Sequence, residues 1–192
     1  MSAVQIQGNA SGTGTLTVAA PSTNTNRTLT LPDNTGTLIS TGSTFAGTGP
    51  TFSATMSATQ SVTASTYTQI VFNTEEFDTA SCYNNTGATV SGIPAYSFLP
   101  NVAGYYQVSS ALYPNSAVTA INCSIYKNNV AYKVISVGSA GSSASTNILV
   151  YLNGSTDYIS VFGLLVGTTP SFLNTGSGGA LAYFSAAMVR AA

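Results

Sequence analysis

Apolar and polar residues alternate with a period of two along most of this chain, and that alternation restricts the fold more than any other feature. Neighbouring side chains of a strand point to opposite faces of a sheet, so the pattern predicts strands. We expect strands near residues 52–56, 66–73, 89–98, 104–113, 119–127, 130–137, 146–152, 156–166 and 180–190. No segment has a convincing helical pattern, and the Ala-rich end (185–192) continues the strand pattern.

Turn-forming residues separate these segments at near-regular intervals. Gly, Pro and Asn favour the backbone conformations that turns require. The breaks fall at Pro100 to Gly104, Pro114-Asn115, Asn128-Asn129, residues 138–145, Asn153-Gly154 and residues 167–179. Many short strands punctuated in this way are typical of a β-sandwich or jelly roll. We therefore expect an all-β domain over residues 50–192.

The first forty residues carry a different pattern. Thr15-Leu-Thr-Val, Thr28-Leu-Thr-Leu and Thr37-Leu-Ile predict short strands that place Leu or Val on one face and Thr on the other. Such ribbons bury too little apolar surface to be stable alone. We interpret residues 1–40 as a β-ribbon attachment module that needs a neighbour, and the Gly/Thr-rich residues 41–49 as a flexible linker.

Charge is scarce throughout the sequence. Four Lys and Arg against five Asp and Glu give 5% charged residues and a net charge of -1, whereas soluble domains average roughly a quarter charged. No basic patch can form, so a nucleic-acid partner is not expected. The longest apolar runs are too short for a membrane helix, and the N-terminus lacks the pattern of a signal peptide. A surface this neutral suits a subunit covered by neighbours in an assembly.

The sequence offers little chemistry. Without histidine, no Ser-His-Asp or Cys-His pair is possible, and we expect neither an enzyme nor a cofactor. Glu75, Glu76 and Asp78 form the one polar cluster, in a segment interpreted as a long acidic loop. They are candidates for a solvated loop, a calcium-type cation site or, least of all, an acid–base pair.

The two cysteines, Cys82 and Cys123, allow one disulfide or two thiols. A chain that folds in cytosol keeps them as thiols, and Cys123 alternates with Ile121 and Ile125 as a small buried hydrophobe would.

Adjacent tyrosines at 105 and 106 put aromatic rings on both faces of one strand. Tyr106 forms a core face with Val108 and Leu112, and Tyr105 and Tyr113 lie on the opposite face. Two accounts stay open: burial on both sides within a sandwich, or one tyrosine face in contact with a partner subunit.

Five segments occur in a particular order: "FNTEEFDT", "FLPNVAGYY", "IYKNN", "ILVYLNGSTDYISVFG" and "LAYFSAAMV". This ordered set resembles the globular head of complement C-one-q, a ten-stranded jelly roll shared with tumour necrosis factor, and spans about three-quarters of the chain. The turn at Asn153 to Asp157 is looser than the family's usual Gly-Asp pair. The resemblance implies a compact homotrimer, with subunit contacts expected from Phe52, Tyr106, Tyr151 and Tyr183.

The stretch "GTGTLTVAAPSTNTNRTLTLPDNTGTLIS" resembles modules that precede receptor-binding or decorative heads in tailed bacteriophages. It implies a virion surface protein, folded in bacterial cytosol, whose residues 1–40 bind other virion proteins. A tail-fibre knob for host attachment is the first hypothesis and a capsid decoration or cement protein the alternative. A glycan-cleaving enzyme lacks the residues, and a secreted adhesin lacks the signal.

Antiparallel strands alternate in direction, so every second connection collects at one end of the domain. We expect the tight turns at residues 100–104, 128–129 and 153–154 beside the C-terminus. The loops 74–89, 114–119, 138–145 and 167–179 then lie at the far end. Loops on a rigid scaffold are where binding residues concentrate, so a host receptor is expected to meet Glu75, Glu76, Asp78 and Phe172.

Overall fold

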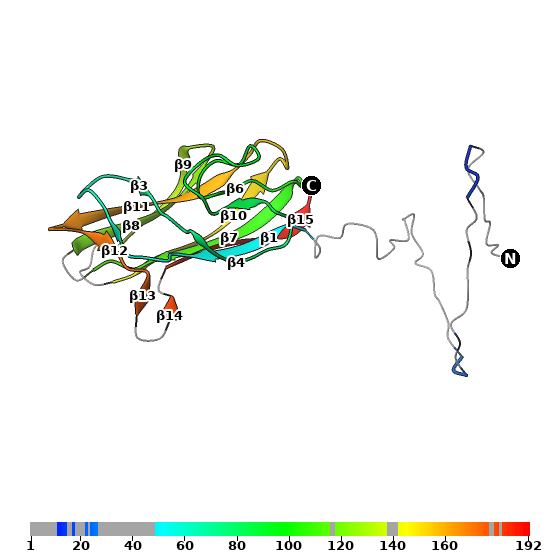
Figure 1. Cartoon of the computed structure of the whole chain (residues 1–192), viewed down its shortest axis with the longest axis horizontal. Helices are drawn as coiled ribbons and strands as arrows, with labels where there is room; N and C mark the ends of the chain where they lie inside the picture. The colour runs from blue at the N-terminus through cyan, green and yellow to red at the C-terminus, as the bar shows by residue number, and fades with distance from the viewer. Residues whose placement is uncertain are drawn as a thin grey trace. The chain divides into compact units, whose positions relative to one another are not determined.

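A computed structural model describes residues 49–115, 118–137, 142–176, 179–180 and 182–192, together with residues 11–14, 17, 22 and 24–26 (Figure 1). The chain divides into two compact units, Met1–Ile39 and Ser40–Ala192. The predicted attachment module (1–40) and linker (41–49) fall almost entirely outside the described residues, so both stay predictions. All the strands that the structure describes lie in the second unit.

Every regular element in the described part of the chain is a strand, and no helix there is long and apolar enough to span a membrane. The strands are β1 (Thr51–Thr55), β2 (Gln60–Ser61), β3 (Thr68–Gln69), β4 (Thr74–Asp78), β5 (Tyr83–Asn84), β6 (Ser97–Phe98), β7 (Gly104–Leu112), β8 (Val118–Lys127), β9 (Val130–Val137), β10 (Ala144–Leu152), β11 (Ile159–Gly167), β12 (Ser171–Phe172), β13 (Thr175–Gly176), β14 (Gly179–Ala180) and β15 (Tyr183–Ala191).

Two large antiparallel sheets make up most of the described domain, and two small two-stranded sheets, β2 with β12 and β13 with β14, accompany them. The first has the strand order β10-β7-β15-β1-β4, and the second has the order β5-β6-β11-β8-β9, with β3 paired to β11. In Figure 1, β1, β4 and β15 run along the lower side and β3, β6 and β9 along the upper side. Neighbours far apart in sequence, such as β1 beside β15, are the crossovers expected of a jelly roll. The predicted all-β jelly-roll fold is confirmed.

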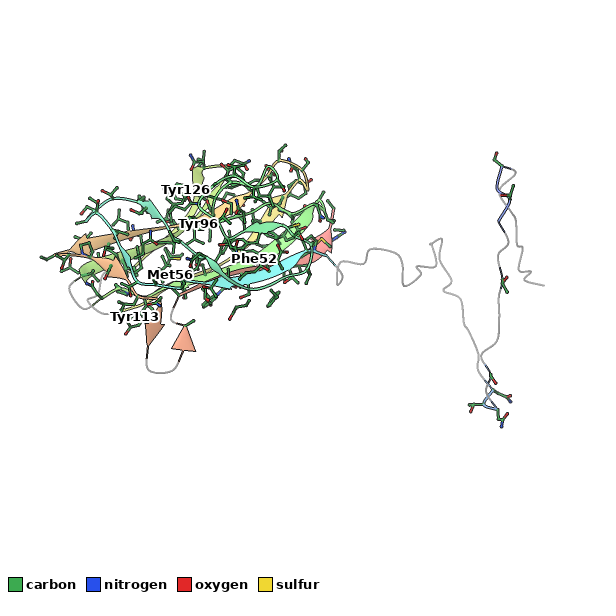
Figure 2. The ribbon with its side chains drawn as sticks, in the orientation of Figure 1. Phe52, Met56, Tyr96, Tyr113 and Tyr126 are labelled. Atoms are coloured by element: carbon green, nitrogen blue, oxygen red, sulfur yellow. The ribbon has the colours of Figure 1, made fainter. Side chains whose placement is uncertain are left out.

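Aromatic rings fill the core between the sheets. Phe52 of β1, labelled in Figure 2, stacks on Tyr83 and Phe98 of the second sheet, with ring centroids 4.4 and 4.6 Å apart. Phe184 of β15 meets Phe52 edge-on at 4.8 Å. Such pairs stabilise a core beyond the area they bury. Phe52 therefore ties the two sheets together.

The turn before β7 explains why the segment from Phe98 to Val108 carries two adjacent tyrosines. The Tyr106 side chain is fully buried, and its hydroxyl donates a hydrogen bond of 2.7 Å to the Val102 carbonyl. A buried tyrosine needs such a partner for its hydroxyl. The turn supplies that partner, while the second tyrosine, Tyr105, points to the other face of the sheet.

The expected placement of the tight turns is confirmed. Gly104 pairs with both Leu152 and Ala191, and the backbone of Gly154 lies against Val102 and Ala103. At the opposite end, Leu112 pairs with Ala144, and Pro114 bridges Phe172. The domain's first strand begins at the tight-turn end, because Thr51 pairs with Ala187.

The placement of the acidic segment was wrong. Glu75, Glu76 and Asp78 belong to edge strand β4, which pairs with β1, and not to a loop at the far end. From Asp78 the chain runs toward the tight turns, where Tyr83 joins the row Phe98, Ile159 and Lys127. A second correction concerns residues 66–73 and 89–98, which contain only the two-residue strands β3 and β6 and one bridge.

Candidate functional site

The first sheet turns one face away from the core. In β7 every second residue from Gly104 to Leu112 is buried, so Tyr105 and Gln107 point outward. Large apolar side chains gather on this side: Tyr105 is 43% exposed, Tyr151 41%, Leu149 54% and Val189 55%. The rings of Tyr105 and Tyr151 lie 5.5 Å apart. We call this surface, with the outward residues of β10, β7, β15 and β1, the open face.

Two hollows mark the open face. The larger, about 560 Å³, is lined by Tyr105, Leu149, Val189, Arg190, Ala191 and Ala192. The smaller, about 290 Å³, is lined mainly by small polar and Ala side chains of β1, β7 and β15, with the exposed ring of Phe77 at its rim. Arg190 is the one charged residue in either lining. The open face is thus apolar at one end and lined mainly by small uncharged side chains across its middle, where the Glu76 carboxylate reaches Ser53.

A second apolar surface lies on edge strand β9, which ends the second sheet. Val130, Tyr132, Val134 and Ile135 are all exposed on it. Exposed edge strands offer unpaired backbone groups to another chain. The open face and the β9 edge are therefore two separate exposed apolar surfaces of the described chain.

Of the four predicted subunit-contact residues, two lie in the core and two lie on the outward side of the first sheet. Phe52 and Tyr106 are fully buried within one chain, so neither has a surface for a second subunit. Tyr151 lies on the open face, and Tyr183 is half-buried on the outward side of β15. Sequence reasoning kept the Tyr105 face only as an open alternative for a partner contact, and it missed Leu149 and Val189. Their signal was present in the alternation itself, since each neighbours a buried residue of the same strand.

The three acidic side chains do not converge on one point. Asp78 accepts hydrogen bonds from the backbone N–H groups of Ala80 (3.1 Å) and Tyr83 (2.7 Å), which shapes the turn after β4. Glu76 accepts a 2.6 Å hydrogen bond from the Ser53 hydroxyl, and Glu75 is exposed. Within the described ranges no three His, Cys, Asp or Glu side chains are grouped to hold a metal ion. The contacts of Asp78 and Glu76 are structural.

Phe172, predicted to meet a receptor, is a core residue. Its side chain is fully buried, and its ring tip lies over Gly163 of β11. Phe172 does lie at the far end, beside Pro114, but its ring offers no exposed surface there, so the predicted receptor contact is wrong.

The thiols are unpaired and buried, as expected. Burial raises the pKa of the Cys123 thiol to about 12 and also raises the pKa of Cys82. Because the thiolate is the reactive form, burial and the raised pKa both lower the reactivity of these thiols in the folded chain.

An ion pair fixes the tight-turn end. Lys127 lies 2.9 Å from the Asp157 carboxylate and donates a hydrogen bond to the Tyr151 carbonyl. Burial alone would raise the pKa of Asp157, but hydrogen bonds from Lys127 and Asn128 and the Lys127 charge lower it. The Asn153 side chain accepts backbone N–H bonds from Ser155, Thr156 and Asp157. The loose five-residue turn is rigid for this reason.

No family model and no curated protein matches the chain. Among solved structures, murine APRIL is similar with a TM-score of 0.53 and 9% identity, over 73% of this chain and 99% of that one. Eiger TNF from S. frugiperda gives 0.51 and 12%, over 75% and 93%. These two show that the fold is a TNF-like jelly roll. A PRD1 vertex protein, P5, is similar more weakly, at 0.46 and 10% over 74% and 96%.

Proposed function

We propose that this chain is a non-enzymatic structural protein that assembles into a homotrimer and forms a knob on the surface of a tailed-phage virion. In this proposal residues 1–40 bind other virion proteins and the knob contributes to host attachment. The sequence resemblance of the N-terminal segment supports the phage context. The absence of histidine from the sequence supports a structural role over a catalytic one.

The exposed apolar residues of the open face are the main support for the proposed homotrimer. Tyr105, Tyr151, Leu149 and Val189 leave large apolar surfaces in water on one sheet. A contiguous apolar patch on a soluble chain marks an interaction site, and subunit interfaces are rich in tyrosine and poor in charge. A surface with so little charge suits a partner with equally little charge. A second copy of this chain, with a net charge of -1, is such a partner.

The open face and the β9 edge differ in shape, and this difference favours a closed ring of subunits. The open face carries hollows of about 560 and 290 Å³, whereas β9 is an exposed edge. A contact that joins two different surfaces is heterologous, and it must close on itself to avoid an open filament. The TNF-like fold supports closure with three subunits.

A capsid decoration or cement protein is the second candidate. The sequence shows no long shaft repeat between residue 40 and the knob, so the knob lies close to its platform, as a cement protein would. Counting copies per purified particle separates the two roles. A number that matches the capsid shell indicates decoration, and a few copies per particle indicate the tail.

Light scattering on the purified chain tests the trimer. We expect a mass of about three times the 19.5 kDa of one chain. Leu149→Arg and Val189→Arg place charge on the open face and are expected to give folded monomers, because an unpaired buried charge is costly. Val166→Arg, an exposed position on the second sheet, is the matched control and should stay trimeric. A monomeric unmodified chain, or a trimer in both open-face variants, would contradict the proposal.

A further inference from the structure

A hollow of about 190 Å³ lies in the connection between β5 and β6. It is lined by Ser81, Tyr83, Asn84, Asn85, Thr86, Val90, Ser91 and Ile93. Tyr83 points into the core, where it stacks on Phe52, so its neighbour Asn84 points outward. The connection that Asn84 holds therefore lies on the side of the second sheet that faces away from the open face. Figure 2 labels Tyr96, from the same connection, on that side.

The wall of the hollow is held in place by the chain itself. The Asn84 side-chain amide, which is buried, donates to the carbonyls of Ala88 (2.7 Å), Ile93 (2.8 Å) and Pro94 (3.1 Å). Its carbonyl oxygen accepts from the Thr86 backbone at 2.9 Å and from the Thr86 hydroxyl at 2.8 Å. Val90 and Ile93 exchange two backbone hydrogen bonds. A ligand would find this shape already formed, and preorganisation lowers the cost of binding.

Two non-glycine residues of the lining adopt the left-handed backbone conformation. Ser81 and Ser91 both have φ of 51°, and Gly92 follows at 82°. Such conformations are uncommon for residues with a Cβ and cost free energy. These residues turn the backbone sharply at two points of the lining.

Three polar side chains in the lining have no hydrogen bond to the rest of the described protein. These are Ser81, Asn85 and Ser91, and two of them, Ser81 and Ser91, are exposed. Val90 and Ile93 add apolar surface between them. Free hydroxyl and amide groups around an apolar floor are what a small polar ligand needs for orientation.

We propose that this hollow binds one neutral sugar ring of a glycan. No charged side chain lines it, so it gives no ion-pair partner to a phosphate, a carboxylate or a cation. Hydroxyl and amide groups match the donors and acceptors of a sugar, and the apolar floor matches the C–H face of its ring. Its volume lies below the roughly 300 Å³ of a drug-sized pocket, which limits the occupant to a single ring.

The site stays accessible in the proposed trimer for two reasons. It lies on the other side of the domain from the open face, and β5 and β6 lie at the opposite edge of the second sheet from β9. It adds a ligand class to the proposed host attachment, yet binding itself does not require the trimer. If the chain is monomeric and binds sugar, the trimer proposal fails and the sugar-site proposal stands. If the chain is trimeric and binds no sugar, the sugar-site proposal fails and the trimer proposal stands.

Saturation-transfer NMR on the full-length chain provides the test. The probes are methyl glycosides of glucose, galactose, mannose and N-acetylglucosamine, with sialic acid as an anionic comparison. We expect transfer to at least one neutral glycoside, with a Kd on the order of 1 mM, as single-ring contacts give. No transfer at about 50 mM of any neutral glycoside, or transfer to sialic acid alone, would overturn the proposal.

Variants locate the binding. Asn85→Ala/Ser91→Ala removes two of the free polar groups and is expected to weaken binding at least about tenfold, since each lost hydrogen bond is worth about 1 kcal/mol. Asn129→Ala/Thr168→Ala truncates the same two kinds of side chain at exposed positions outside the hollow and should bind as before. Val90→Lys replaces an exposed apolar side chain of the lining with a charged one and should also abolish binding. Undiminished transfer in both hollow variants would exclude this site.

Discussion

A Cβ atom added at Gly163 would lie 2.3 Å from Cζ of Phe172. Gly163 is in β11 of the second sheet, and Phe172 is in β12 near the far end of the domain. The Phe172 ring occupies the space that a side chain at residue 163 would take. That packing holds the segment after β11 against the core.

Gly163→Ala should therefore destabilise the domain. The Phe172 ring and the Ile70 side chain, whose Cδ1 lies 3.0 Å from the added Cβ, are both fully buried. Overpacking of this kind costs about 1–3 kcal/mol. A urea titration measures the loss, with exposed Thr168→Ala as a control expected within about 0.5 kcal/mol of the unmodified chain. Equal midpoints for Gly163→Ala and the control would refute the packing argument.

Cys123 should react with thiol reagents only after unfolding. It is fully buried, and a pKa of about 12 leaves almost no thiolate at neutral pH. We expect the labelling rate at Cys123, followed by mass spectrometry, to equal the unfolding rate. Rapid labelling of the native chain, or a crosslink between Cys82 and Cys123, would contradict this.

Asp157→Asn should remove the contribution that the ionised Asp157 carboxylate makes to the free energy of unfolding, and this contribution depends on pH. The folded-state pKa of Asp157 lies below the usual value for an aspartate, so its contribution is complete above the unfolded pKa and is lost as pH falls through the folded pKa. At neutral pH, we expect the free energy of unfolding of the unmodified chain to be about 0.5–1 kcal/mol larger than that of Asp157→Asn. This difference should close as the pH falls below the folded-state pKa. Denaturation at neutral and acidic pH checks this, and a gap that widens in acid would refute it.

Deleting residues 1–44 should leave the knob folded and trimeric but unable to join particles. The core cluster lies wholly within residues 52–188, so the deletion removes none of it. Light scattering and particle incorporation measure the two outcomes. Normal incorporation of the shortened chain would contradict the role of residues 1–40.

The long strands could be predicted because each carries its own alternation. β7, β8, β10, β11 and β15 run for nine or ten residues, and the pattern outweighs local exceptions. The short strands β3 and β6 could not be delimited, since two residues contain no period. The segment 85–96 is shaped by the Asn84 side chain, a tertiary contact that no local pattern reveals.

The candidate site was predicted only in part. The acidic residues at 75–78 are typical of a solvated loop, yet Asp78 serves as an acceptor for its own backbone. The core face of β7, with Tyr106, Val108 and Leu112, was predicted and is the buried one. The outward residues of β10 were within reach of the same pattern, but nothing local showed that they gather beside Tyr105. The hollow beside Ser91 depends on left-handed backbone at non-glycine residues, which composition does not predict.

The knob's two ends of chain meet at one pole of the domain. Met188 donates a backbone hydrogen bond to Pro50, and Ala192 donates one to Ala103. A peptide fused after Ala192 would thus emerge at the pole where the chain enters the domain at Pro50. An insertion at the exposed residues Thr168 and Thr169 would instead emerge at the opposite pole.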